Sequence, residues 1–222
     1  MKTLPQWIRL GCCAVAAVGF GITTSLPARG EQDPRTGEME VFVGVLVEPT
    51  SDLSDFVNKT DSAFVGTLEK TSVALVGSAQ ERLFTVLTFR IIEWLYGKQA
   101  VPVSAVVEVL APGGHYLEKD GKRTPTRPSK ESEELKVGAQ YFVPLESGDK
   151  FGPATVGKQM VASSLALTLL EGSRVLPALK NSAWATKVLN AETSKPRETP
   201  GPPPPARELF LAAIRAAGAA KR

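Results

Sequence analysis

The stretch "RLFTVLTFRIIEWLYG", residues 82–97, decides the fold class. Leu87, Phe89 and Ile91 are separated by single residues, and this period of two is typical of a strand with one buried face. Gly97 is expected to end the strand. A strand of this length predicts that the surrounding chain builds a β-sheet.

Shorter stretches of the same kind flank this strand and are separated by turn residues. Gly66 lies inside one of them and predicts either a bulge or a close approach of another backbone segment. Many short strands between turns are typical of a small barrel or sandwich. We therefore expect a mainly β protein whose centre is a small barrel of five or six strands. The expected strands are residues 41–47, 62–77, 82–97, 103–114, 137–146, 163–170 and 173–179.

Two helices are expected beside the strands. Ser51 or Asp52 can cap a short helix whose apolar side holds Phe56 and Val57. Residues 206–222 place apolar residues at helical spacing near the C-terminus. This C-terminal helix either docks on the domain, which is the commoner case, or is offered to a partner. Residues 117–136 mix six basic and five acidic residues, so we expect a solvated loop there.

The N-terminus has the pattern of a secretory signal peptide over residues 1–28. Lys2 and Arg9 precede or flank an apolar run of 13 residues at 10–22, which is short for a transmembrane helix. Cleavage is expected after Ala28, with Ser25 as an alternative, so the protein is expected to be secreted or periplasmic. An uncleaved N-terminal anchor is the competing interpretation, and only that case would place the chain in a membrane.

Removing residues 1–28 changes the composition in two ways. Cys12 and Cys13 would leave, so the mature chain could form no disulfide. Lys2 and Arg9 would leave as well, and the net charge would fall from +3 to +1. A chain this close to neutral gives no electrostatic reason to expect nucleic acid as a partner.

The mature chain is expected to have four parts. Residues 29–39 are polar and predict a flexible N-terminal segment, and residues 40–190 predict the β-barrel domain. Residues 191–205 hold a run of prolines and predict an extended spacer. The C-terminal helix follows at 206–222.

One motif resembles a nucleotide-binding loop but lacks a residue and a flanking helix that such a loop needs. "GPATVGKQ", residues 152–159, matches the start of a phosphate-binding loop. Gln159 stands where Ser or Thr should bind Mg²⁺, and the flanking sequence is a polar turn followed by a strand pattern instead of a helix. We interpret the stretch as a glycine-rich turn between strands and expect no cofactor.

The residues around the turn at Pro112-Gly113-Gly114 are the best candidates for a binding site. His115 and Tyr116 follow Gly113 and Gly114, a turn that could hold them outward. The alternative is that His115 is an ordinary exposed loop residue with no role in binding. Trp94 and Tyr96 end the longest strand, where aromatic side chains can anchor a partner or a sugar ring. They are equally typical of the closing layer of a barrel, and Trp94 is expected to be mainly core.

The sequence marks no catalytic or metal site. His115 is the only histidine, whereas hydrolytic triads and zinc sites need a supported His or several His and Cys ligands. Asp52, Asp55 and Asp61 do not have the spacing of a calcium loop. These absences exclude the commonest metalloenzyme patterns.

The strand series resembles a group of poorly characterised bacterial secreted proteins. The resemblance rests on the stretches "SAFVGTLE", "TVLTFRIIEWLYG", "VVEVLAPGG" and "LKVGAQYFVPLE". In addition, "ARELFLAAIR" resembles the group's C-terminal helix. The resemblance covers about residues 60–146 and 206–215. It implies a barrel similar to the oligonucleotide/oligosaccharide-binding fold, in the version used by tissue inhibitors of metalloproteinases. Tyr96 and Gln140 depart from the group's usual Lys and Glu, and the mature chain lacks the inhibitors' N-terminal cysteines, so protease inhibition is not implied.

These observations favour a non-catalytic binding or interaction module of the cell envelope, with a protein or a glycan as its partner. A hydrolase that uses carboxylates or an unmarked Ser–Lys pair is the second hypothesis. A signal-anchored structural protein is the third. The oligomeric state has no signature in the sequence.

Overall fold

The computed structural model of the 222-residue chain describes residues 31–32, 38–41, 50, 52–77, 81–148, 160–162, 166–179, 182–195 and 204–221. The predicted signal peptide, the "GPATVGKQ" stretch and most of the Pro-rich spacer lie outside these residues. Within the described part of the chain, no helix is both long and apolar enough to span a membrane.

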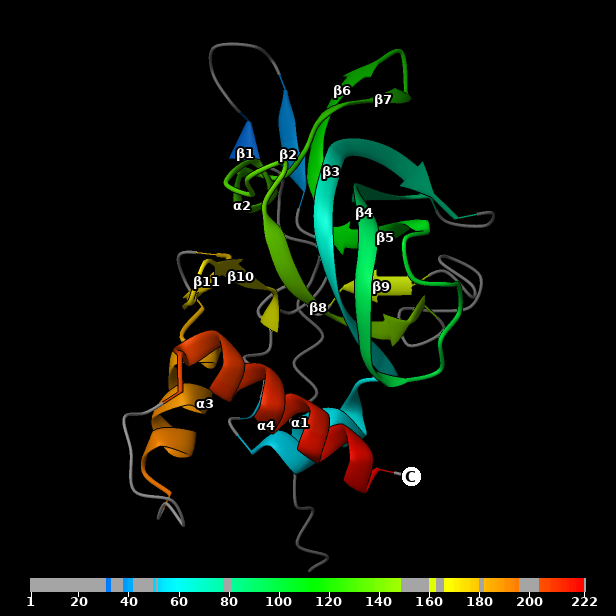
Figure 1. Cartoon of the computed structure of the whole chain (residues 1–222). Coiled ribbons are helices and arrows are strands. Elements are labelled where there is room, and N and C mark those ends of the chain that lie inside the picture. The colour runs from blue at the N-terminus through cyan, green and yellow to red at the C-terminus, as the bar shows by residue number, and fades with distance from the viewer. Residues whose placement is uncertain are drawn as a thin grey trace, which may run out of the picture.

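A closed barrel of five strands forms the centre of the molecule (Figure 1). β3 (Ser62–Val76), β4 (Arg82–Gly97) and β5 (Val106–Pro112) pair as antiparallel neighbours, and β8 (Gln140–Ser147) pairs with the other edge of β3. β9 (Met160–Ala162) closes the ring by running parallel to β5 and antiparallel to β8. The expected small barrel in a mainly β protein is confirmed.

The barrel is filled by the side chains that the period of two in β4 predicts to be buried. Leu87, Phe89 and Ile91 are at most 1% exposed and belong to one interior cluster. Phe89 meets Phe64 edge to face, with ring centroids 5.8 Å apart, as aromatic quadrupoles prefer. The register of β3 shifts at Gly66, where a Cβ would lie 2.7 Å from the Phe64 ring. The predicted bulge is therefore confirmed.

Three helices cover one side of the barrel (Figure 1). α1 (Leu53–Lys59) is capped by Asp52, whose carboxylate accepts the N–H groups of Ser54 and Asp55. α3 (Trp184–Thr193) and α4 (Ala206–Ala220) pack beside it. The Asp52 cap and the two predicted helices are confirmed by these elements.

The helices and the barrel share a second apolar core centred on Trp184. Its ring is fully buried, stacks on Phe142 at 16° and meets Phe210 of α4 edge to face. The indole N–H donates to the carbonyl of Thr50 at 2.8 Å. Because Phe210 and Ile214 are fully buried here, α4 is docked on the domain.

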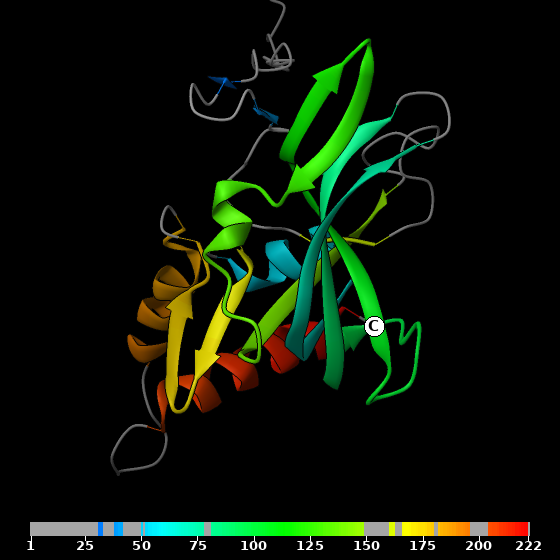
Figure 2. The same cartoon turned by 90° about the horizontal axis from the view of Figure 1, so that it is seen from above.

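A second sheet lies at the end of the molecule opposite α4, as Figures 1 and 2 show. Its strands follow the order β1 (Glu31–Gln32), β2 (Met39–Val41), β6 (Gly114–Lys119) and β7 (Lys122–Arg127). β6 and β7 form the green hairpin that projects from the barrel in Figure 2. All pairings in this sheet are antiparallel.

The sequence prediction of a solvated loop over residues 117–136 is wrong. The segment forms the β6–β7 hairpin and the short helix α2 (Lys130–Glu133). Asp120 and Gly121 have φ of 53° and 72°, the left-handed conformations that a two-residue hairpin turn requires. An Asp-Gly pair is the standard sequence signal for that turn. The signal was present, but the high charge content of the segment led to the prediction of a loop.

The predicted flexible segment at 29–39 is also wrong where the structure describes it. Glu31–Gln32 pairs with Met39–Glu40, and Met39–Val41 pairs with β6. A strand was expected over 41–47, and it is observed up to Val41; residues 42–47 lie outside the described residues. Short polar strands of this kind are held by a neighbouring strand, which composition alone does not reveal.

The later strand patterns form a hairpin that widens the barrel sheet. β10 (Thr168–Glu171) pairs with β8, and β11 (Arg174–Pro177) forms the sheet edge. The predicted boundary between the domain and the Pro-rich spacer at residue 191 falls inside α3. That helix continues because Thr193 and Ser194 bond back to the carbonyls of Leu189 and Asn190, so the boundary moves to after Thr193.

Candidate functional site

The predicted site at Gly113, Gly114, His115 and Tyr116 is buried instead of being presented to solvent. His115 is 1% exposed and Tyr116 is 7% exposed, and both lie within β6. The expectation of outward-held side chains, and the alternative of an exposed loop histidine, are both wrong. The two side chains are buried by tertiary structure, because β2 pairs with β6 directly at His115 and Tyr116.

Polar contacts hold this N-terminal strand in place. Nε2 of His115 lies 3.3 Å from Oε1 of Glu40 without a hydrogen bond between them, and the Glu40 carboxylate accepts the Lys130 backbone N–H at 3.1 Å. Arg127 donates to the carboxylate of Glu38 at 2.8 Å. We call Glu38, Glu40, His115, Arg127 and Lys130 the N-terminal joint. It links β2 to β6, β7 and α2.

Trp94 and Tyr96 lie at the opposite end of β4, where they line a groove of about 520 Å³. Pro112, beside the glycine turn, pairs with Phe84 near the start of β4, and Trp94 comes ten residues later. The two predicted sites are therefore on the order of 30 Å apart along the strand. We call this hollow the end groove. Its lining residues are Trp94, Leu95, Tyr96, Gly97, Gln99, Arg215, Gly218, Ala219 and Lys221.

The two aromatic residues of the end groove are held firmly from behind. Trp94 is half-buried, packs on the Phe64 ring at 5.4 Å and donates its indole N–H to the carbonyl of Val101 at 2.9 Å. The Tyr96 hydroxyl lies 2.6 Å from the hydroxyl of Thr60. Burial raises the pKa of Tyr96 to about 12. With its indole N–H engaged, the half-buried Trp94 ring offers the groove fixed apolar surface, whereas Tyr96 is only 6% exposed and adds little surface of its own.

The second wall of the end groove is the last turn of α4. Gly218 is essential to it, because a Cβ at that position would lie 2.4 Å from the Cβ of Tyr96. Lys221 donates to the carbonyl of Val57 at 2.7 Å and to that of Thr60. Arg215 forms a two-bond ion pair with Glu93, at 2.9 and 2.8 Å. These contacts hold the helix end against the strand end.

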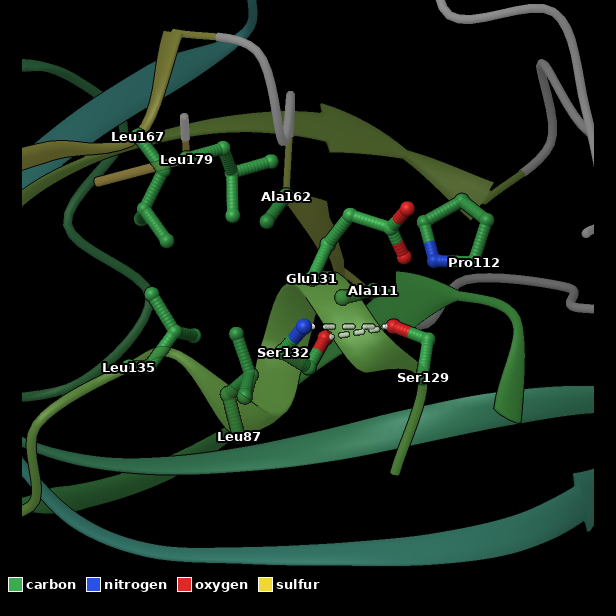
Figure 3. Close-up of a pocket in the computed structure, with 10 residues that line it drawn as sticks. All are labelled: Leu87, Ala111, Pro112, Ser129, Glu131, Ser132, Leu135, Ala162, Leu167 and Leu179. Carbon is green, nitrogen blue, oxygen red and sulfur yellow. Dashed lines mark hydrogen bonds between the residues drawn. The ribbon is translucent and has the colours of Figure 1, made fainter. Parts of the chain in front are cut away.

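A smaller hollow lies between α2 and the barrel (Figure 3). Its volume is about 20 Å³, enough for roughly one ordered water. We call it the cap pocket. Only Pro112 and Glu131 of its lining are half-buried, and the rest are buried. The lining residues are Leu87, Ala111, Pro112, Ser129, Glu131, Ser132, Leu135, Ala162, Leu167 and Leu179.

Glu131 is the one ionisable group in the cap pocket. Its Oε2 is buried and has no hydrogen-bond partner among the residues that the structure describes. Burial raises the pKa of Glu131, and the nearby carboxylates of Glu40 and Glu134 act in the same direction. The other two polar residues of the lining, Ser129 and Ser132, bond to each other at 3.0 Å.

One of the pocket serines, Ser129, lies next to a lysine, and a Ser–Lys pair is what the hydrolase hypothesis requires. Ser129 caps α2, where its hydroxyl accepts the N–H of Ser132 at 3.3 Å. The ammonium of the adjacent Lys130 pairs with Glu40 at 3.2 Å. These contacts give Ser129 and Lys130 structural roles. Across the described ranges, no group of three or more His, Cys, Asp or Glu side chains is arranged to hold a metal ion.

Comparison of the chain with known protein families and with curated proteins finds no match. The resemblance to a group of bacterial secreted proteins therefore stays a prediction, although the barrel that it implies is observed.

Sequence reasoning missed Gln99, Arg215, Gly218 and Lys221 in the end groove and Glu131 in the cap pocket. Gly218 was the most accessible signal, since a glycine inside an alanine-rich helix usually marks a close approach. Which strand end α4 approaches depends on long-range packing. Glu131 lies in a run of mixed charge, and nothing local separates it from its exposed neighbours.

Proposed function

We propose that the protein is a non-catalytic binding module that acts outside the cytoplasm and binds a glycan in the end groove. The observation that carries this proposal is the pairing of a groove of about 520 Å³ with the fixed, half-buried ring of Trp94. Ligand sites typically occupy about 300–1,000 Å³, so the volume suits two or three sugar rings better than a single ion or a flat protein epitope. The predicted signal peptide supports the location.

The chemistry of the groove suits a polar, ring-shaped ligand. Trp94 provides apolar surface of the kind that packs against sugar rings, and Gln99 and Arg215 provide hydrogen-bonding groups. Because the hydrogen bonds of Trp94 and Tyr96 to Val101 and Thr60 already hold the rings, binding would cost little side-chain entropy.

The lining favours binding over hydrolysis of the glycan. Glycosidases of the usual kind place two carboxyl groups about 5–10 Å apart around the scissile bond. The lining residues that the structure describes include no Asp or Glu, and the nearby carboxylate of Glu93 is engaged by Arg215. The carboxylate hydrolase of the second hypothesis therefore has less support at this groove than a binding module.

Two matched variants test the proposal by isothermal titration calorimetry against a panel of oligosaccharides, with chitin oligomers among them. Ala216 and Ala219 are both exposed alanines near the end of α4, but only Ala219 lines the groove. We expect Ala219→Phe to abolish oligosaccharide binding and Ala216→Phe to retain it. Equal binding by both variants, or no binding by the unmodified chain, would contradict the proposal and favour a protein partner.

The location has its own test. The intact mass of the protein from the envelope fraction should correspond to residues 29–222. A mass that includes residues 1–28 would support the signal-anchored interpretation.

A further inference from the structure

The segment that contains α2 lies over the cap pocket and is fastened to the barrel at both of its ends. The N–H of Ser129 donates to the hydroxyl of Thr85 on β4 at 3.1 Å. The N–H of Lys136 donates to the hydroxyl of Tyr141 on β8 at 2.7 Å. We call the residues between these two anchors, 130–135, the cap segment. Two fixed ends with a short helix between them are the arrangement of a lid.

One group of the cap segment does not suit the closed arrangement. Oε2 of Glu131 is buried without a hydrogen-bond partner among the described residues, and Figure 3 shows the carboxyl group beside Pro112. Burying a polar atom without a partner is costly, and the cost is greater when the group is charged. The cap pocket has a volume of about 20 Å³, so it cannot hydrate an ionised carboxylate as bulk water does. The ionised form of Glu131 therefore opposes closure of the segment.

We propose that the cap segment is an acid-closed lid, which packs on the barrel when Glu131 is protonated and opens more often when Glu131 is ionised. Opening would carry the carboxyl group into water and uncover Leu87 and Leu167, which line the pocket. Leu135, which is 8% exposed and belongs to the interior cluster of the barrel, holds the lid when it is closed. This device is independent of the function proposed for the end groove.

The sign of the pH dependence follows from burial. Burial raises the pKa of Glu131, so the closed lid holds this proton more tightly than an open lid does. The stability that this adds to the closed lid is fully present below the usual carboxyl value of 4.5. It is lost as the pH rises through the raised pKa of Glu131.

Other charged or titratable groups lie on the cap segment and on the elements beside it. They are Lys130, Glu133, Glu134 and Lys136, with Glu40 of β2, His115 of β6, Arg127 of β7 and Glu171 of β10. Lys130 is tied to Glu40 through its N–H and its ammonium group, at 3.1 and 3.2 Å. A histidine can change its charge between pH 5 and 8, and His115 lies 3.3 Å from Glu40. The test must therefore separate Glu131 from His115.

The test is amide hydrogen exchange of the folded chain by NMR at pH 4.5 and pH 7.5, with each rate corrected for the intrinsic rate at that pH. The reporters are the amides of Glu133 and Leu135, which donate to the carbonyls of Ser129 and Ser132. We expect their protection to be at least about threefold greater at pH 4.5. The change should exceed that of the β4 amides, which report on unfolding of the whole domain.

Two variants assign the effect to one carboxyl group. Glu131→Gln, a neutral side chain of the same size, should give at both pH values the protection that the unmodified chain has at pH 4.5. Glu133→Gln, on the same helix but outside the pocket lining, should keep the pH dependence.

Three results would overturn the proposal. The first is protection of the cap segment that does not change with pH, which is expected if one ordered water satisfies the ionised carboxylate. The second is an undiminished pH dependence in Glu131→Gln, which would assign the effect to His115 or Glu40. The third is an equal change in the β4 amides, which would show that the whole domain and not the lid responds to pH.

Discussion

Similar sequence signals lie beside the two ends of β4, but the residues at one end are covered and those at the other end border a groove. At one end, Gly113 and Gly114 precede His115 and Tyr116, and β2 covers them as part of the N-terminal joint. At the other end, Trp94 and Tyr96 precede Gly97, and the last turn of α4 leaves a groove beside them. In both places, glycine next to aromatic residues lies where two segments approach closely. Whether the aromatic residues are covered or border a groove depends on the segment that packs there, β2 at one end and α4 at the other.

Removing Tyr116 should have the largest effect on stability and none on binding. Tyr116→Ala deletes a buried ring that contacts Met39 and lies under Arg123. We expect the free energy of unfolding in urea to fall by about 3 kcal/mol. Oligosaccharide binding by the fraction that remains folded should not change. Lost binding with unchanged stability would return the functional site to the glycine turn.

The sequence predicted the barrel well because its signals are local. The alternation in residues 82–97, the bulge at Gly66 and the Asp52 cap all depend on a few neighbouring residues. Of the candidate binding residues, the role of Trp94 and Tyr96 stays a prediction, and the expected exposure of His115 and Tyr116 was wrong. Trp94 and Tyr96 do line a hollow, whereas His115 and Tyr116 are covered by a strand that comes about 75 residues earlier in the chain. Burial by a distant strand leaves no local signature.

Gly218→Val should have the next largest effect and should act at the groove end. The new side chain would meet the Tyr96 Cβ, so the last turn of α4 must move away from β4. We expect a loss of about 2 kcal/mol in the free energy of unfolding, together with loss of oligosaccharide binding. Ala216→Val, which adds the same side chain at an exposed site of this helix, should cost well under 1 kcal/mol in the same urea titration. Similar losses in the two variants would mean that α4 does not depend on the approach at Gly218.

Tyr96→Phe should have a moderate effect that depends on pH. Loss of the bond to Thr60 should cost about 1 kcal/mol near neutral pH. Burial raises the pKa of Tyr96 from 10.0 to about 12, so the folded chain holds this proton more tightly than the unfolded chain. The corresponding stability is complete below pH 10 and is lost as the pH rises towards 12.

Urea unfolding at pH 8 and pH 11 measures this contribution. Between these two values the unmodified chain should lose about 1 kcal/mol more than Tyr96→Phe. Burial also raises the pKa of Tyr141, which is present in both chains and cancels in the difference. Equal losses in both chains would show that Tyr96 is more solvated than its packing indicates.

Glu38→Gln should have the smallest effect on stability and tests the role of the N-terminal joint. The variant weakens a partly exposed ion pair with Arg127, so the expected cost is below about 1 kcal/mol. Hydrogen exchange of the β2 amides should accelerate, while exchange in β4 and oligosaccharide binding stay unchanged. A change in binding would show that the joint and the end groove are coupled.

The most direct test of the account is the indole N–H spectrum of residues 29–222 during titration with an oligosaccharide that binds. The chain has three tryptophans, of which Trp7 lies in the predicted signal peptide, so Trp94 and Trp184 remain. Trp94 lines the end groove and Trp184 is fully buried, which makes the second residue an internal control. We predict that the Trp94 signal shifts on binding and the Trp184 signal stays in place. Binding that leaves Trp94 unmoved would contradict the assignment of the end groove as the ligand site.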